Sequence, residues 1–207
     1  MASPKKLRLL QLAGAALPRD GSELYFEVGT FQGKSLIAAM RGHAHARAVA
    51  CDNFSLFDDP HEPRNQKALE ANLRDYGLEH RVTFFNRDFR DVIQDWPSLG
   101  LPPVGCYFYD GAHDEDSQYR GIRDAEPLLA DEALVLVDDW RFAPDSDSRA
   151  EAGTRRAMAA CPRTSRPAQR RLGTMVERPR RARVQKKARP NRIRQPVTAR
   201  PKDPACP

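Results

Sequence analysis

The sequence predicts an α/β fold with a doubly wound, mostly parallel β-sheet, and two patterns support this prediction. Short apolar runs of strand length alternate with stretches of helical composition through the first 160 residues. Strands joined by helical crossovers pair in parallel, and helices on both faces of the sheet make such strands apolar throughout. In addition, a glycine or an aspartate follows each run within two residues, at the sheet edge where folds of this kind bind ligands.

The predicted elements follow one another in a regular order, after an amphipathic leading helix whose apolar stretch covers residues 9–17. Five strands are expected at residues 23–28, 46–51, 82–86, 105–109 and 133–137. Helices are expected at residues 34–40, 63–76, 88–96, 116–129 and 151–160. Gly77 and Pro97 end two of these helices, and Pro127 weakens the last turn of a third, because proline lacks the N–H group that a helix needs.

The chain divides by composition into a core over residues 1–160 and a basic segment over residues 161–207. The whole chain of 207 residues carries a net charge of +6. The segment holds 15 Lys and Arg against two acidic residues, a net charge of +13, which leaves the core at −7. Eight of its 47 residues are proline, and hydrophobic periodicity is absent. Such a composition buries too little apolar area to offset the entropy of ordering, so we predict a disordered tail.

The cysteines and the apolar runs indicate a protein of the cytoplasm. Cys51, Cys106, Cys161 and Cys206 show no zinc-binding spacing, and reduced thiols are the expectation for a cytosolic chain. No apolar run reaches the roughly 18 residues that a membrane span requires. We therefore expect no membrane partner.

The turn after the first strand contains Gly29 and Gly33, followed by Lys34 and Ser35. Glycines let a backbone turn sharply and approach a ligand closely. The dinucleotide pattern G-x-G-x-x-G is absent. A phosphate-binding loop needs four residues between its glycines, and only three are present here. Because the Gly-Lys-Ser ending and the apolar strand before residues 138–139 fit that loop otherwise, a P-loop-like NTPase stays open as an alternative.

The same turn, with Glu27 two residues before Gly29, resembles the first motif of class I S-adenosylmethionine-dependent methyltransferases, an acidic residue followed by x-G-x-x-x-G. The resemblance implies a Rossmann-like fold whose turn wraps the methionine part of S-adenosylmethionine. It implies cofactor contacts from Glu27, Gly29, Thr30, Gly33 and Ser35.

Two further aspartates stand where that superfamily places cofactor contacts. Asp52 closes the second strand, where the resemblance implies a carboxylate on the ribose hydroxyls. Asp88 follows the third strand, where the family has a polar residue near the adenine amine. Each of the two is also a candidate helix cap.

Asp110 and His113 follow the fourth strand, and Asp138 and Asp139 follow the fifth. Together with the earlier strand ends, they resemble the small bacterial methyltransferases that include sugar O-methyltransferases of macrocin and aminocoumarin type, over about residues 5–160. The resemblance implies a divalent metal, Mg²⁺, on the three aspartates. Because an aliphatic hydroxyl is too weak an acid to ionise at neutral pH, methyl transfer to it needs a base and gains from a metal.

The predicted catalytic base is Asp110, with His113 as the second candidate, since an imidazole titrates near neutrality. A loop position for His113 and a metal-free role for residues 138–139 stay open. The predicted acceptor is a small hydroxylated molecule, a sugar or another natural product. Homo-oligomerisation is left open.

The methyltransferase superfamily usually has two more strands after the fifth, and the sequence predicts that this pair is missing or degenerate. Residues 170–177 are the nearest candidate. Two explanations compete for the basic segment. It is either an arm that binds nucleic acid, although it lacks interleaved aromatic residues, or the product of a shifted reading frame in GC-rich DNA.

Overall fold

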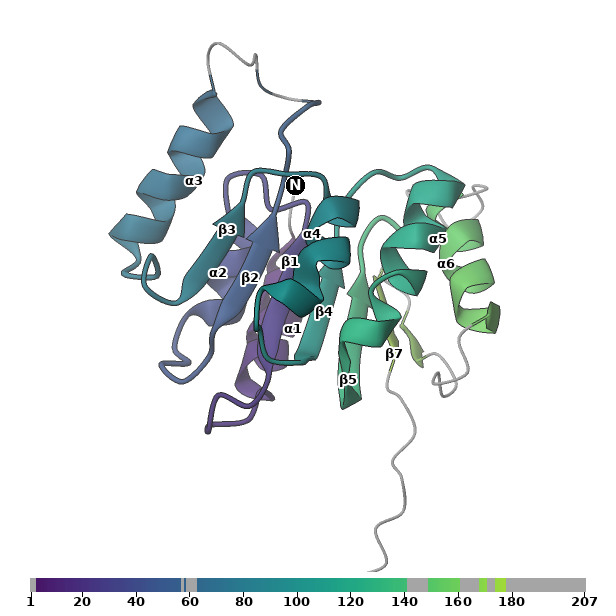
Figure 1. Cartoon of the computed structure of the whole chain (residues 1–207), viewed down its shortest axis with the longest axis horizontal. Coiled ribbons are helices and arrows are strands. Elements are labelled where there is room, and N and C mark those ends of the chain that lie inside the picture. The colour runs from purple at the N-terminus through teal and green to yellow at the C-terminus, as the bar shows by residue number, and fades with distance from the viewer. Residues whose placement is uncertain are drawn as a thin grey trace, which may run out of the picture.

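The computed structural model describes residues 3–56, 58, 63–140, 149–160, 168–170 and 174–177. Within these residues, seven strands form one sheet in the order β3-β2-β1-β4-β5-β7-β6 (Figure 1). The strands are β1 (Leu24–Val28), β2 (Ala48–Cys51), β3 (Val82–Phe85), β4 (Val104–Tyr109), β5 (Leu129–Val137), β6 (Ala168–Arg170) and β7 (Thr174–Glu177). The helices are α1 (Pro4–Ala15), α2 (Lys34–Met40), α3 (Arg64–Asp75), α4 (Phe89–Asp95), α5 (Glu115–Arg123) and α6 (Arg149–Ala160), with 3-10 turns η1 (Trp96–Ser98) and η2 (Glu126–Leu128).

Strands β1 to β5 pair in parallel, which confirms the predicted α/β fold. The backbone ladder continues one residue past the strand ends. The N–H of Gly29 donates to the carbonyl of Cys51 at 2.9 Å, and the N–H of Asp110 donates to the carbonyl of Val28 at 2.9 Å. The residues that follow β1, β2 and β4 therefore meet at one edge of the sheet.

The sheet separates two hydrophobic cores. On one face, side chains of β1, β2 and β4 pack against α1, α2 and α3. On the opposite face they pack against α4, α5 and α6, and α4 and α5 lie in front of the sheet in Figure 1. Side chains alternate between the faces of a strand, so Tyr25 joins the first core and Phe26 the second. Because both faces are covered, all five residues of β1 are buried.

Helix α1 is the predicted leading helix, and it begins at Pro4, five residues before its apolar stretch. Ser3 caps it, since its side chain accepts a hydrogen bond from the Lys6 N–H at 3.2 Å, and Pro4 occupies the first turn. Both residues favour a helix start at these positions. The consequence for the site is that Lys6 belongs to a helix.

The predicted helix over residues 116–129 ends early, at Arg123. The chain then forms η2, which contains Pro127, and β5 begins at Leu129, four residues before the predicted start. The missing N–H of Pro127 prevents the helix from continuing. This boundary is therefore a correction to the sequence prediction.

The final strand pair, predicted to be missing or degenerate, is present, and the nearest candidate, residues 170–177, contains β7 and the last residue of β6. Strands β6 and β7 pair antiparallel with each other, and β7 pairs antiparallel with β5 through Val135–Glu177, Leu136–Val176 and Val137–Met175. Strands of three and four residues are too short to show a hydrophobic period, so composition hid them. The other residues of the predicted disordered tail, and Cys161 and Cys206 with them, lie outside the described residues.

Cys51 and Cys106 are buried free thiols, as predicted. Of the helices that the structure describes, none combines the length and the apolar character that crossing a bilayer requires.

Candidate active site

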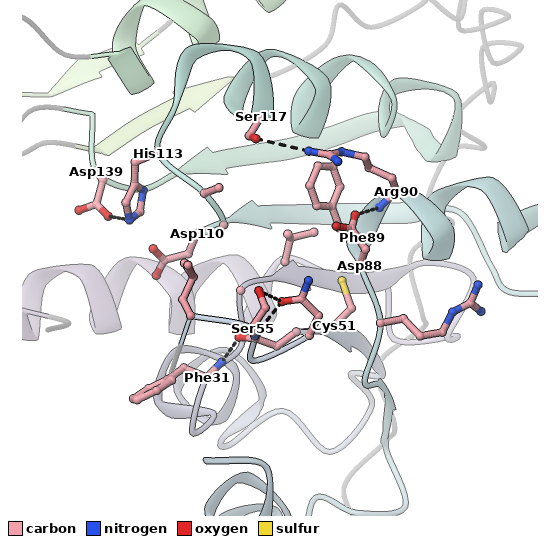
Figure 2. Close-up of a pocket in the computed structure, with 18 residues that line it drawn as sticks. Phe31, Cys51, Ser55, Asp88, Phe89, Arg90, Asp110, His113, Ser117 and Asp139 are labelled. Atoms are coloured by element: carbon pink, nitrogen blue, oxygen red, sulfur yellow. Dashed lines mark hydrogen bonds and ion pairs between the residues drawn. The ribbon is translucent and has the colours of Figure 1, made fainter. Parts of the chain in front are cut away.

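A cavity of about 520 Å³ opens at the carboxyl ends of β1 to β4 (Figure 2). This volume is in the range of small-molecule sites, roughly 300–1,000 Å³. Its wall brings together residues that lie far apart in the sequence, as the strand-end pattern predicts. The predicted site residues in this wall are Gly29, Asp52, Asp88, Asp110, His113 and Asp139.

The other predicted site residues are not part of the cavity wall. Four of them are buried: Glu27 lies in β1, Thr30 and Gly33 in the turn that follows it, and Ser35 in α2. Asp138 lies beside the wall and contacts Lys6. The predicted site residues therefore form two groups, one that lines the cavity and one that is buried beside it.

Gly29 has a positive φ of 83° and lies directly against the backbone after β4. A Cβ at this position would lie 2.0 Å from the carbonyl oxygen of Asp110. Gly33 also has a positive φ, of 84°, and a Cβ there would lie 2.6 Å from Cδ1 of Leu69 on α3. Only glycine fits the first position, because both its conformation and the space exclude a side chain.

Glu27 is fully buried and is held by two hydroxyl donors. The hydroxyl of Tyr25 donates to Oε2 at 2.6 Å, and the hydroxyl of Ser35 donates to Oε1 at 2.7 Å. Burial raises the pKa of the Glu27 carboxyl to about 8, against the opposing effect of these hydrogen bonds. Since Ser35 lies in α2 and Glu27 in β1, the cluster fixes the helix to the strand across the turn.

Asp52 holds two loops at the cavity wall through backbone hydrogen bonds. Its Oδ2 accepts from the Phe31 N–H at 2.8 Å, and its Oδ1 accepts from the Phe54 N–H at 2.8 Å. Phe31 and Phe54 both have positive φ angles, 48° and 51°. Bulky residues pay about 1–3 kcal/mol for such a conformation, so the two hydrogen bonds help to maintain both loops. The sequence showed no sign of this strain.

Asp88 both caps a helix and lines the cavity. Its Oδ1 accepts from the Arg90 N–H at 2.9 Å at the start of α4, so the cap interpretation is confirmed. The Arg90 guanidinium reaches across to the Ser117 hydroxyl at 3.4 Å (Figure 2). Arg90 and Ser117 also line the cavity, and sequence reasoning missed both because no local motif marks them.

Three carboxylates gather beyond β4 and β5. Asp110, Asp138 and Asp139 each offer an oxygen, and these oxygens lie within 4.8 Å of one another. We call these three residues the acidic triad. Burial raises the pKa of the Asp110 carboxyl, while the neighbouring Lys6 ammonium opposes the rise.

Lys6 provides the positive charge at the acidic triad. Its Nζ lies 2.9 Å from Oδ2 of Asp110 and also contacts Oδ2 of Asp138. Only 12% of its side chain is exposed. Sequence reasoning missed this residue, because 104 positions separate it from Asp110 and nothing in the local pattern relates the two.

His113 and Asp139 face each other at the rim of the cavity (Figure 2). The Nε2 of His113 lies 3.1 Å from Oδ2 of Asp139. A carboxylate in this position holds the ring proton on Nε2 and leaves Nδ1 as the acceptor. Asp139, two residues after the end of β5, has a positive φ of 52°.

Residues 26–140, more than half of the chain, match the model of a protein family described as a methyltransferase domain. No curated protein matches the chain significantly.

Several solved structures share the fold at low sequence identity. An O-methyltransferase from Bacillus cereus, in complex with S-adenosylhomocysteine (SAH), is 20% identical with a TM-score of 0.65, and the match covers 87% of this chain and 83% of that chain. The O-methyltransferase TomG from Streptomyces achromogenes, in complex with S-adenosylmethionine, is 21% identical with a TM-score of 0.62, covering 86% and 80%. The SAH-bound methyltransferase PaMTH1 from Podospora anserina is 15% identical with a TM-score of 0.64, covering 86% and 79%.

The family match covers β1 from Phe26 onward, the turn after it, strands β2 to β5 and the acidic triad. The fold is that of methyltransferases solved with S-adenosylmethionine or its product. The chain therefore belongs to the methyltransferase family.

Proposed function

We propose that this protein transfers the methyl group of S-adenosylmethionine to a hydroxyl oxygen of a small acceptor, a sugar or another natural product. The observation that carries the proposal is the meeting of Gly29, Asp52, Asp88 and Asp110 on one cavity in a chain of the methyltransferase family. Each of them follows a different strand, and a cofactor laid along this edge would contact all of them.

The cofactor would lie with its methionine part on the turn after β1 and its adenosine part toward β2 and β3. Gly29 lets the turn pack directly against the Asp110 backbone, which brings the turn and the residues after β4 together at the cofactor site. Each Asp52 oxygen accepts one backbone hydrogen bond, and a carboxylate has about four acceptor sites in all, so lone pairs remain for the ribose hydroxyls. Asp88, which follows β3, would accept a hydrogen bond from the adenine amine. Glu27 and Ser35 would support the turn from behind.

The acceptor would lie toward the ends of β4 and β5, near His113 and Asp110. Methyl transfer from a sulfonium is an in-line displacement, so the protein must position the acceptor oxygen and remove its proton. The contact between His113 and Asp139 orients the imidazole with Nδ1 free to accept that proton. Asp110 already contacts the Lys6 ammonium, which favours His113 over Asp110 as the base.

The acidic triad suits a hard divalent cation, because carboxylate oxygens are the ligands that Mg²⁺ prefers. Asp110, Asp138 and Asp139 would hold the ion, since their oxygens lie within 4.8 Å of one another. A bound Mg²⁺ would lower the pKa of the acceptor hydroxyl. We propose this assistance as part of the function.

The P-loop-like NTPase is disfavoured by the position of Ser35. In a phosphate-binding loop this hydroxyl binds the Mg²⁺ of the nucleotide. Here it is buried and donates to Glu27 at 2.7 Å, so it points away from any ligand on the turn.

Two of the structural neighbours are O-methyltransferases. They are the Bacillus cereus protein and TomG, which is involved in tomaymycin synthesis. These neighbours support a hydroxylated natural product as the acceptor. A sugar, the acceptor of the macrocin and aminocoumarin type of enzyme, is one candidate among such molecules.

The proposal is tested with S-adenosylmethionine whose methyl group is deuterated and with pairs of small acceptors that differ only in a hydroxyl or an amine. We expect the label on the hydroxyl member of a pair. His113→Asn should lower turnover about 100-fold or more, the usual contribution of a general base, while SAH affinity stays unchanged. Label on the amine members alone would contradict O-methylation. Full turnover in His113→Asn would contradict the assignment of His113 as the base.

A further inference from the structure

Lys6 is the one cation that the described residues place in direct contact with two members of the acidic triad. Its ammonium lies 2.9 Å from Oδ2 of Asp110 and contacts Oδ2 of Asp138, and it stands 5.3 Å from the centre of the Phe108 ring. The side chains of Asp110 and Asp138 are only 22% and 14% exposed. At such low exposure, water screens the attraction poorly, and an unpaired carboxylate would be costly.

The position of Lys6 is fixed by the packing of α1. Leu10 and Ala13 of this helix are buried in the core. Gly14 lies so close to α2 that a Cβ there would come within 1.9 Å of the Ala39 carbonyl oxygen. Because α1 rests directly on the α2 backbone, Lys6 extends from a packed helix and reaches the triad in a defined place.

Lys6 uses the same oxygens that a divalent cation would need. A metal bound by Asp110 and Asp138 takes lone pairs from their carboxylates, and the Oδ2 atoms of both already accept from Lys6. An ammonium and a divalent ion at one pair of oxygens would also repel each other strongly.

We propose that Lys6 is the resident counter-ion of the acidic triad, and that a divalent cation binds Asp110 and Asp138 only by displacing its ammonium. This inference rests on the metal site of the proposed function and adds to it a residue outside the strand-end pattern. Without metal, Lys6 balances the charge of the triad. With metal, its side chain leaves the triad while α1 stays packed on α2.

The test compares Mn²⁺ binding by calorimetry in the wild type, Lys6→Met and Lys5→Met. Methionine is unbranched and only one atom shorter than lysine, and it removes the charge. Lys5 is exposed in the same helical turn, so Lys5→Met is the matched control for the loss of one positive charge. Lys6→Met should bind Mn²⁺ on the order of 10- to 100-fold more tightly than wild type, the range over which groups that contact metal ligands change metal affinity. Lys5→Met should match wild type.

Three outcomes separate this inference from the proposed function. Tighter binding in Lys6→Met that is lost again in the double variant Lys6→Met/Asp138→Asn supports the competition. Equal Mn²⁺ affinity in wild type and Lys6→Met overturns the competition and leaves the metal site standing. No Mn²⁺ binding in either protein overturns both, and SAH binding by the same samples then shows whether the cofactor site survives.

A second measurement needs no variant. Acetylation of the wild-type protein, followed by mass spectrometry, reports how accessible Lys6 is relative to Lys5. Saturating Mn²⁺ should raise the labelling of Lys6 and leave that of Lys5 unchanged. Unchanged labelling of Lys6 at saturating Mn²⁺ would overturn the displacement.

Discussion

Glu27 and Asp52 show that carboxylates near this cavity do different work according to their exposure. Asp52 lies at the cavity wall and accepts hydrogen bonds from two backbone N–H groups. Glu27 lies beneath the turn, fully buried between two hydroxyl donors. Sequence reasoning treated both as cofactor contacts, because the motif gives a residue type and a spacing but no direction. Direction depends on the strand pleat, which places Glu27 on the α2 side of β1.

The buried Glu27 carboxyl makes stability depend on pH. Its pKa is about 8 in the folded protein, against an ordinary value of 4.5. Below pH 4.5 the carboxyl is protonated in both the folded and the unfolded protein, so it does not lower the free energy of unfolding. Between 4.5 and 8 only the unfolded state ionises, so stability falls as pH rises, and above 8 the loss is complete.

Glu27→Gln should remove this pH dependence, because glutamine stays neutral and can still bond to both hydroxyls. Relative to wild type, the variant should gain on the order of 4 kcal/mol of unfolding free energy between pH 5 and pH 9. Urea denaturation at the two pH values measures the change. Glu70→Gln on the exposed side of α3 is the control and should shift stability equally at both. A pH-independent difference for Glu27→Gln would show that Glu27 does not titrate in this range.

Gly29→Ala should destabilise the turn by more than the cost of its positive φ angle alone. Gly42 has nearly the same φ, 84° against 83°, but a Cβ at Gly42 meets nothing within 4 Å. Gly42→Ala should therefore cost only the conformational strain, about 1–2 kcal/mol. Gly29→Ala adds a clash with the Asp110 backbone, so it should be less stable than Gly42→Ala and bind SAH at least about tenfold more weakly, a loss of about 1.4 kcal/mol. Equal thermal stability and equal SAH affinity of the two variants would contradict the close approach.

At the scale of elements, the five parallel strands were predictable and the final pair was not. A buried parallel strand must be apolar along its whole length, which leaves a clear run in the sequence. Strands β6 and β7 comprise three and four residues and join the sheet edge through backbone hydrogen bonds. Backbone pairing places little demand on side-chain type, so the arginine-rich composition concealed them.

Truncation tests the contribution of the last two strands. A chain that ends at residue 160 loses β7, which pairs with the end of β5 at Val135, Leu136 and Val137. It should lose about 2 kcal/mol or more of unfolding free energy, since backbone groups of β5 lose their partners. A chain that ends at residue 177 keeps the pairing and should match full length in thermal and urea denaturation. Equal stability of the two truncated chains would contradict the assignment of these strands.

At the scale of the whole molecule, the cavity follows from the topology, while its polar contacts do not. Parallel strands bring their carboxyl ends to one edge, so Asp52, Asp88 and Asp110 could be predicted as neighbours from the sequence alone. Lys6 and Arg90 could not, because each reaches its partner from a helix whose rotation and docking depend on packing. The net charge of −7 over the first 160 residues also fits a domain that binds small molecules better than one that binds nucleic acid.

Calorimetry of the full chain with SAH and, separately, with ATP tests the central claim most directly. The account predicts binding heat with SAH and none with ATP. It also predicts SAH affinity reduced about tenfold or more in Asp52→Ala, since a hydrogen bond to a charged group contributes about 1.5–3 kcal/mol. Heat with ATP and none with SAH would contradict the account and restore the nucleotide-binding alternative.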